Sequence, residues 1–397
     1  MKYTSRHDFQ SIIPEGFHEI NLGDLITFQR GHDLPNKKRK KGSYPVVASN
    51  GIVGFHNEFK VKGPGVIVGR SGNIGEPYYI NKNYWPLNTT LYVKEFKSTS
   101  PEFVYYFLKS INLGHYNSGS AVPSLNRNYI HPLKIKVPKS ITYQNKIASL
   151  LSTFDDKIEL NCRMNATLEQ IAQAIFKQWF IDFEFPDENG QPYKSSGGEM
   201  VESEMGEIPR GWEVKPIDEI ADFLNGLALK KYPPEGDEYL PVIKIRELKQ
   251  GITDSTDKAS PNIDEKYIID DGDVLFSWSG SLECCLWSKG KGALNQHLFK
   301  VTSEHYPKWF YYFWIMQHLP AYRRIAKDKT TTMGHIKRRH LSESLVLVPP
   351  MKTIDRMDVV MKPLFKKTLL NNLNSLLLSL IRDLLLPKLM SGRICLS

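Results

Sequence analysis

Two halves of this sequence repeat the same motifs in the same order. The segment Ile13–Phe17 returns as Ile208–Trp212, and Pro101–Phe107 returns as Pro307–Phe313. The separation between matching motifs grows from 195 to 206 residues along the chain, so the loops differ in length while the order holds. A period this long predicts two similar domains rather than a solenoid of short repeats.

The length and composition are those of a globular protein. A chain of 397 residues accommodates two or three domains, each with its own core. Neither a signal peptide near the N-terminus nor an apolar run of bilayer-spanning length is evident, which indicates the cytoplasm. The four cysteines include no Cys-x-x-Cys pair, so a zinc site is not expected.

Charge is distributed unevenly. The net charge is +9, yet residues 183–207 hold seven acids and one base, a local charge of −6. This segment is also rich in Gly, Pro and Ser, which is typical of a linker. The rest of the chain carries the compensating positive charge, which favours a polyanionic partner.

Each repeat reads as a mixed globular part followed by a long helix. Strands are expected at residues 65–69 and 133–137, and at 273–277 and 345–348 in the second repeat, because β-branched runs are bounded there by Gly or Pro. Aromatic residues recur at i, i+3, i+4 in one helix of each repeat, a spacing that favours a core-facing stripe over base stacking. The stripe residues are Phe103, Tyr106, Phe107, Trp309, Tyr312 and Phe313.

Both long helices carry apolar residues at alternating steps of four and three, which predicts a left-handed coiled coil. The seam of the first runs from Ile147 to Trp179 and includes Ile171. Polar residues interrupt both seams, and we interpret Asn161 and Asn371 as positions that fix register; the alternative is that one or both face water. Pro387 predicts that the second helix kinks or ends near Leu386.

Three segments resemble one known family. The motifs are residues 172–183 (AQAIFKQWFIDF), 204–212 (EMGEIPRGW) and 382–392 (RDLLLPKLMSG). They closely resemble the DNA-specificity subunit of type I restriction–modification systems, over essentially the whole chain. In that family each repeat is a target-recognition domain with a conserved spacer helix, and the paired helices act as a molecular ruler.

The resemblance implies an α+β fold, with two similar mixed α/β target-recognition domains separated by two long antiparallel helices that form a coiled coil with internal pseudo-twofold symmetry. The expected divisions are recognition domain 1 (1–140), spacer helix 1 (141–183), acidic linker (184–207), recognition domain 2 (208–350) and spacer helix 2 (351–392). It also implies that the chain reads a bipartite, interrupted DNA site. The expected partners are double-stranded DNA, two modification (methyltransferase) subunits and the restriction (translocase/nuclease) subunits.

Motifs for catalysis are lacking. The glycine-rich run at 63–75 has no Gly-Lys-Ser/Thr ending, which favours a turn between strands over a phosphate cradle. The Asn/Asp-Pro-Pro-Tyr tetrad of amino-methyltransferases is not found in the sequence. We therefore expect a non-catalytic subunit without its own cofactor. S-adenosylmethionine, ATP and Mg²⁺ are expected only in its partners.

Candidate DNA contacts come from basic and amide side chains, because Arg suits phosphate and guanine whereas Asn suits adenine. They lie in the basic run 37–41, in the loops that follow matching strands, and on an expected strand at 242–246; for each, an ordinary solvated position is the alternative. The candidates are Lys38, Arg39, Arg70, Ser71, Asn73, Ser124, Asn126, Arg127, Lys244, Arg246, Ser279, Lys329, Thr331, His335, Lys337 and Arg338.

Two other classes of function stay open at this stage. One is a methyltransferase fused to its own reader, which binding of S-adenosylmethionine to the isolated chain would support. The other is a duplicated scaffold, for proteins or DNA of another defence system, whose basicity is incidental. Specific duplex binding that weakens linearly on a log–log salt plot would exclude a purely protein-binding scaffold.

Overall fold

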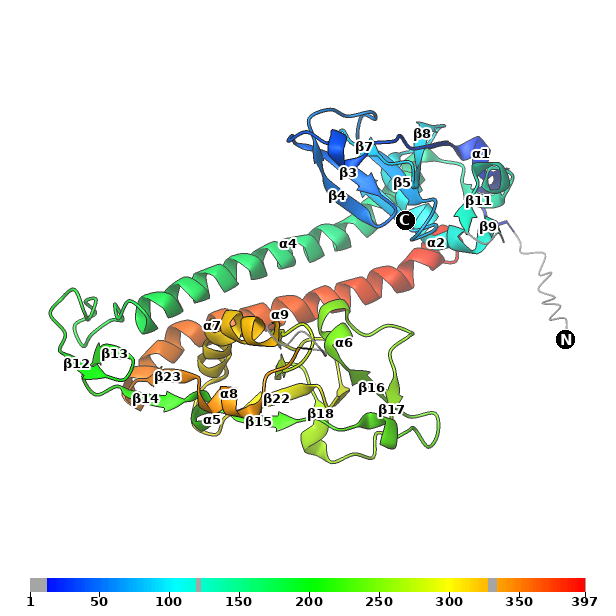
Figure 1. Cartoon of the computed structure of the whole chain (residues 1–397). Helices are drawn as coiled ribbons and strands as arrows, with labels where there is room; N and C mark the ends of the chain where they lie inside the picture. The colour runs from blue at the N-terminus through cyan, green and yellow to red at the C-terminus, as the bar shows by residue number, and fades with distance from the viewer. Residues whose placement is uncertain (1–12, 119–122, 328–333, 397) are drawn as a thin grey trace. The chain divides into compact units, whose positions relative to one another are not determined.

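The computed structural model describes residues 13–118, 123–327 and 334–396. The chain forms two compact units, one made of 1–158 with 378–397 and the other of 159–377. We call them the first and second unit. Each contains a mixed α/β domain and parts of two long helices, which confirms the α+β class and the internal repeat (Figure 1).

The first domain is built mainly from short strands with three helices. Its elements are β1 Phe17–Asn21, α1 Leu22–Leu25, β2 Ile26–Arg30, β3 Tyr44–Ala48, β4 Gly51–His56, β5 Gly65–Gly69, β6 Pro77–Ile80, β7 Trp85–Pro86, β8 Thr90–Phe96, α2 Pro101–Ile111, β9 Asn117–Ser118, β10 Ser124–Leu125, α3 Arg127–Ile130 and β11 Lys134–Pro138.

The second domain follows the same general order with an added helix and an added strand, after a short hairpin at the end of the acidic linker. Its elements are β12 Met200–Ser203, β13 Gly206–Pro209, β14 Glu213–Pro216, α5 Ile217–Ile220, β15 Asp222–Asn225, β16 Leu240–Ile243, α6 Ile245–Gln250, β17 Lys258–Ala259, β18 Ile268–Ile269, β19 Val274–Ser277, β20 Cys284–Leu286, β21 Gly292–Leu294, β22 Leu298–Thr302, α7 Lys308–Lys327, α8 Arg338–Ser342 and β23 Leu345–Val348.

The sheets show that the duplication extends to topology. A four-stranded sheet has the order β2-β8-β5-β6 in the first domain and β15-β22-β19-β20 in the second. Strand β1 pairs with β11 just as β14 pairs with β23, so the start and end of each domain are joined. The four strands expected from the sequence are present as β5, β11, β19 and β23. All five residues of β5 are buried, as its apolar run predicts.

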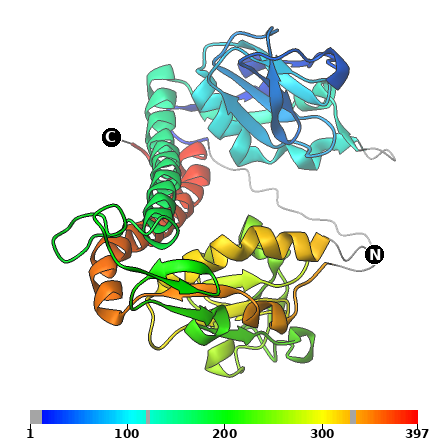
Figure 2. The same cartoon turned by 60° about the vertical axis from the view of Figure 1, so that its left-hand side comes forward.

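Helices α2 and α7 carry the predicted aromatic stripes into the cores. Phe103, Tyr106 and Phe107 are buried in the first unit, and Trp309 and Phe313 in the second. Figure 2 shows α7 lying along the sheets of the second domain. The stripes are therefore core residues, as the spacing predicted.

The two long helices are α4, Ile141–Phe180, and α9, Met351–Met390. Each has 40 residues, about 60 Å at about 1.5 Å per residue. The sequence predicted a kink or an end near Leu386; an end there is wrong, because α9 continues through Pro387 to Met390. Its last turn is held by burial of Leu386, Leu389 and Met390 in the core of the first unit, which offsets the hydrogen bond that proline cannot donate.

A polar network joins α4 to α9 within the second unit. Asn161 Nδ2 donates to Asn374 Oδ1 at 3.0 Å and to Ser375 Oγ at 3.1 Å. Asn371 Nδ2 donates to Asn165 Oδ1 at 2.8 Å. Asn161 and Asn371 are 2% and 3% exposed, so neither faces water. The pairing of rising with falling residue numbers shows that the helices run antiparallel here.

One seam position differs from the sequence prediction. Ile171 is 43% exposed, whereas the neighbouring Ala172 and Phe176 are buried. An α-helix turns every 3.6 residues, so a strict seam drifts around its axis. In this stretch α4 turns Phe176 towards the rings of α7, which moves the buried stripe by one residue.

The Asn network gives a prediction about stability. Asn371→Ala removes the donor to Asn165 and leaves a half-buried acceptor without its partner, which should lower the free energy of unfolding by about 1–3 kcal/mol. Urea unfolding of the full chain measures this. The exposed Lys366→Ala on the same helix serves as the control and should change stability by under about 0.5 kcal/mol; equal effects for the two variants would contradict the role of the network.

At equivalent positions, the two units hold their long helices through different side-chain interactions. In the first, Tyr106 Oη donates to Asp155 Oδ2 at 2.6 Å, and Arg382 of α9 pairs with the same carboxylate. In the second, Phe365 takes the place of Asp155, and its ring lies 5.2 Å from Tyr312. An ion pair in one copy is thus an aromatic contact in the other.

By length and composition alone, α9 is apolar enough to cross a membrane, with a mean hydropathy of 1.2 over its best window. This corrects the expectation that no such run exists. The same helix carries the Asn network and contacts α4 through it. We therefore treat α9 as one partner of the helix pair.

Candidate nucleic-acid interface

Loops at one end of the four-stranded sheet in the first unit surround a hollow of about 930 Å³. Its lining is Gln29–Asp33 at the end of β2, Arg70 after β5, Leu91, and Ser124–Asn128 before and within α3. Segments far apart in sequence therefore meet here. Four of the predicted residues, Arg70, Ser124, Asn126 and Arg127, line this one hollow.

Arg70 is held at the centre of this arrangement. Its Nη1 donates to the carbonyl of Asn88 at 3.1 Å, and its own carbonyl accepts the N–H of Leu125 at 2.8 Å. These bonds tie three loops together. The guanidinium keeps further donors, because it carries five in a fixed fork.

Trp278 has the same position and the same anchors in the second unit. Its Nε1 donates to the carbonyl of Gln296 at 3.2 Å, and its carbonyl accepts the N–H of Ile336 at 2.9 Å. The residue pairs 70/278 and 88/296 are each 208 apart in sequence. The two domains therefore hold one loop frame and place different side chains on it, an arginine in one and an indole in the other.

A second pair of corresponding residues, Arg127 and Arg338, is arginine in both units. Arg127 Nη1 donates to the carbonyl of Phe28 at 3.4 Å, and Arg338 Nη2 donates to the carbonyl of Phe223 at 3.2 Å. Both fasten the start of a short helix to the first strand of the large sheet. Each of these two arginines therefore uses part of its guanidinium group to stabilise the fold.

His131 completes the scaffold beneath the first hollow. Its Nε2 accepts the N–H of Phe28 at 3.0 Å, which requires an unprotonated nitrogen. Burial, assisted by the charges of Arg127 and Lys97, lowers the pKa of His131. The neutral ring therefore supports β2 at neutral pH.

Local contacts hold several predicted residues of these loops in place. Asn126 caps α3 by accepting the N–H of Asn128 at 3.0 Å. Asn73 Nδ2 donates to Tyr78 Oη at 3.2 Å. Ser71 follows Arg70 directly, and Ser124 lies in β10, which pairs with β9.

The basic run 37–41 lies beside strand β4. Lys38 is exposed at the end of a short 3-10 helix, Asn36–Lys38. Arg39 Nη1 donates to the carbonyl of Val53 at 3.3 Å. The run is therefore fixed along one edge of the first domain.

The second domain presents aromatic and imidazole groups. The ring of Trp278 lies 5.6 Å from His297 and 6.3 Å from His335. Ser279 is buried, and its Oγ lies 3.1 Å from His297 Nδ1. Lys337 precedes α8 and donates its N–H to His340. Lys329 and Thr331 lie outside the described residues.

The strand expected at 242–246 is wrong. Strand β16 ends at Ile243, and Lys244 starts helix α6, because the buried Glu247 accepts the N–H of Lys244 at 3.2 Å. Lys244 also pairs with Asp257, and Arg246 pairs with Glu247. Lys244 nonetheless lines a second hollow of about 520 Å³, together with Gln296 and His297.

Several candidate residues were missed in the sequence. Trp278, Gln296 and His297 sit in the second frame, and Ser49 with Asn50 forms a turn against the loop that follows Arg70. Their position in the sequence could have identified them, because each lies immediately after or before a buried strand. Loop residues at such strand ends are where rigid scaffolds commonly carry binding groups.

Groups suited to bond chemistry are scarce. Within 13–118, 123–327 and 334–396 no cluster of three His, Cys, Asp or Glu side chains could hold a metal ion. Burial raises the pKa of Cys285 to about 12 and that of Cys284 well above its ordinary value, so both thiols are protonated at neutral pH.

Comparison with known proteins gives a consistent result. The model of the type I restriction modification DNA specificity domain matches residues 14–170 and again 209–377. The type I restriction enzyme MjaIX specificity subunit of Methanocaldococcus jannaschii is 27% identical over 315 residues, covering 74% of this chain and 69% of that protein. The HindI specificity subunit of Haemophilus influenzae is also 27% identical, covering 74% of this chain and 77% of its own length.

A solved structure shares the fold. The crystal structure of the type I restriction–modification S subunit from M. genitalium aligns over 96% of this chain and 97% of its own, with a TM-score of 0.59 and 16% identity. The family model matches both repeats, which together make up most of the chain. The chain therefore belongs to the type I restriction–modification DNA specificity family.

Proposed function

We propose that this chain reads a bipartite, interrupted DNA site, one half through each recognition domain. The observation that carries this proposal is the duplicated loop frame, which holds Arg70 in one domain and Trp278 in the other by the same backbone contacts. One frame with two sets of side chains suits a target whose halves differ in sequence. Arginine suits guanine in the major groove, whereas the indole ring offers stacking and imidazole offers single hydrogen bonds.

The two 40-residue helices would act as the ruler between half-sites. We propose that Asn161 and Asn371 fix the register of the two helices. A shift of one helix along the other would leave several buried amides without hydrogen-bond partners. The family relationship supports a scaffold role towards modification and restriction subunits. Exposed leucines recur every seven residues along α9, at Leu370, Leu377 and Leu384, which suits a partner helix.

The chain would perform no bond chemistry of its own. S-adenosylmethionine, ATP and Mg²⁺ would be bound by the modification and restriction partners, and the assembly would work on DNA in the cytoplasm. A duplicated scaffold of another defence system is the alternative. Mapping methylated adenines in cells that carry the system tests the proposal: a two-part motif with a fixed gap is expected, and methylation independent of this chain would contradict it.

Exchanging one domain should change one half of the target. Replacing residues 22–137 with those of another family member keeps β1 and the helix pair while renewing the whole first loop frame. The map of methylated adenines should then show one new half-site, the other half-site unchanged, and the same gap. Replacing the equivalent residues 217–348 is the matched experiment. Alteration of both half-sites by one exchange would refute modular reading.

A further inference from the structure

We propose that the outer face of strand β4 is an additional DNA contact of the first domain, with Phe55, Ile52 and Val53 acting as an apolar wedge in the minor groove. The inference rests on the proposed DNA-reading function and assigns to it a surface outside the loop frame. The three side chains are 55%, 53% and 37% exposed, an unusual grouping on one short strand.

A β-bulge produces this exposure. In the pairing of β3 with β4, Val47 faces Ile52 and Val46 faces Gly54, so Val53 is an extra residue. A bulge redirects side chains and twists the strand locally. Ile52 and Val53 are thereby both exposed, and Phe55 follows on the same strand.

The turn of this hairpin adjoins the loop that follows Arg70. A side chain placed at Gly69 would come within 3.3 Å of Ser49, and one at Gly51 would come within 3.4 Å of the Tyr78 ring. The hydroxyl of Tyr78 in turn accepts a hydrogen bond from Asn73. The apolar face therefore continues from the surface that we propose to read bases.

The basic residues beside this apolar face indicate that it contacts DNA. Lys37, Lys38, Lys40 and Lys41 are exposed, and Arg39 is tied to the carbonyl of Val53. The N–H of Lys40 donates to His56 Nδ1 at 3.0 Å, which fixes the basic run along β4. Apolar protein–protein contact surfaces are poor in lysine, whereas minor-groove binders combine basic residues for phosphates with apolar residues that enter between base pairs.

The second domain provides an internal contrast. Its corresponding strand pair, β16 with β17, has helix α6 between the strands and pairs through only two residue pairs. The only residues of β17 are Lys258, which is exposed, and Ala259, which is buried. We therefore expect the distortion of DNA at one half-site alone.

The test uses the full chain assembled with its modification subunits. The probe is a duplex that carries the mapped target, with 2-aminopurine placed at successive positions through and beside each half-site. Binding should raise the fluorescence at one step next to the half-site of the first domain, because an inserted side chain unstacks the base. Ile52→Ala with Phe55→Ala should remove that rise and weaken binding about tenfold, the usual size for losing one base-contacting ring.

Two further variants make the result specific. Phe55→Leu keeps an apolar wedge and should retain most of the fluorescence rise. Val201→Ala removes an apolar side chain that is 36% exposed in the hairpin β12–β13 and should change neither binding nor fluorescence. All three substituted side chains are exposed, so folding should be unaffected.

The outcomes separate the two proposals. Tight, salt-dependent binding without a fluorescence rise, or a rise that survives the double alanine variant, overturns the wedge alone. Loss of modification-subunit assembly in the double variant also overturns it, because the face would then bind protein. Failure of the intact complex to bind any duplex would overturn the proposed function, and the wedge with it.

Discussion

Lengthening both long helices by seven residues should move the two half-sites apart by about three base pairs. Seven residues add about 10.5 Å at about 1.5 Å per residue, and base pairs of a duplex are about 3.4 Å apart along its axis. Seven is also one heptad, so the seam of each helix stays in phase. The insertions go after Ile158 in α4 and after Leu377 in α9, which leaves the Asn network of the second unit intact.

The expected readout is a map of methylated adenines in which the original motif falls to background and a motif with the same bases and a longer gap replaces it. Insertion of seven residues at Gly190, in the acidic linker, is the control and should leave the gap unchanged. A motif with new bases, or one with the old gap, would contradict the ruler. The expected effect is the largest in this chain, because each original site loses one of its two half-site contacts.

Regular patterns in the sequence predicted the scaffold well. The aromatic stripe of α2 and the β-branched run of β5 repeat at the helix and strand periods, and burial alone then decides their orientation. The seam of α4 was predicted except at Ile171, where packing against α7 overrides a strict heptad. The duplication itself predicted the shared topology of the two large sheets.

The candidate site was less accessible to sequence reasoning. Arg70 could be placed after a strand, but its bond to the carbonyl of Asn88 depends on a contact across 18 residues. The alternation around Lys244 imitates a strand, and only the buried carboxylate of Glu247 reveals a helix start. The exposed face of β4 arises from a bulge, which has no sequence signature here beyond Gly51 and Gly54. Such features depend on tertiary contacts, which local periodicity does not encode.

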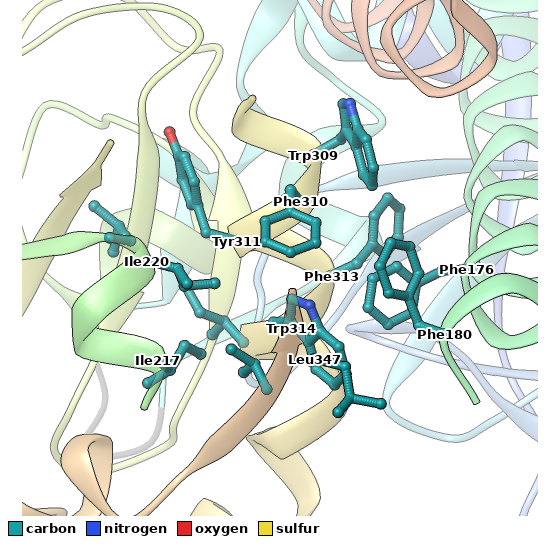
Figure 3. Close-up of a cluster of buried hydrophobic side chains, with 14 of the residues drawn as sticks. Phe176, Phe180, Ile217, Ile220, Trp309, Phe310, Tyr311, Phe313, Trp314 and Leu347 are labelled. Atoms are coloured by element: carbon teal, nitrogen blue, oxygen red, sulfur yellow. The ribbon is translucent and has the colours of Figure 1, made fainter. Parts of the chain in front are cut away.

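Phe180→Ala should weaken the attachment of α4 to the second domain more than any surface change. Phe180 is fully buried at the end of α4, and Figure 3 shows it, with Phe176, facing the aromatic residues of α7. Its ring centroid lies 4.6–6.3 Å from those of five neighbours: Phe176, Trp212, Trp309, Phe310 and Trp314. Removing a ring from such a site costs about 3–5 kcal/mol, through lost burial and the cavity left behind.

Urea unfolding followed by tryptophan fluorescence measures this loss, because three of the five neighbours are tryptophans. The adjacent Ile181→Ala is the matched control; Ile181 is 39% exposed, so the change should stay within about 0.5 kcal/mol. Phe180→Leu keeps most of the apolar volume and should cost less than the alanine variant. A loss below about 1 kcal/mol for Phe180→Ala would be far under the usual cost of a buried ring and would mean that α4 is held to this domain by other contacts. If the chain reads DNA as proposed, loss of this packing should impair recognition of the second half-site first, because α4 contacts the second domain through this cluster.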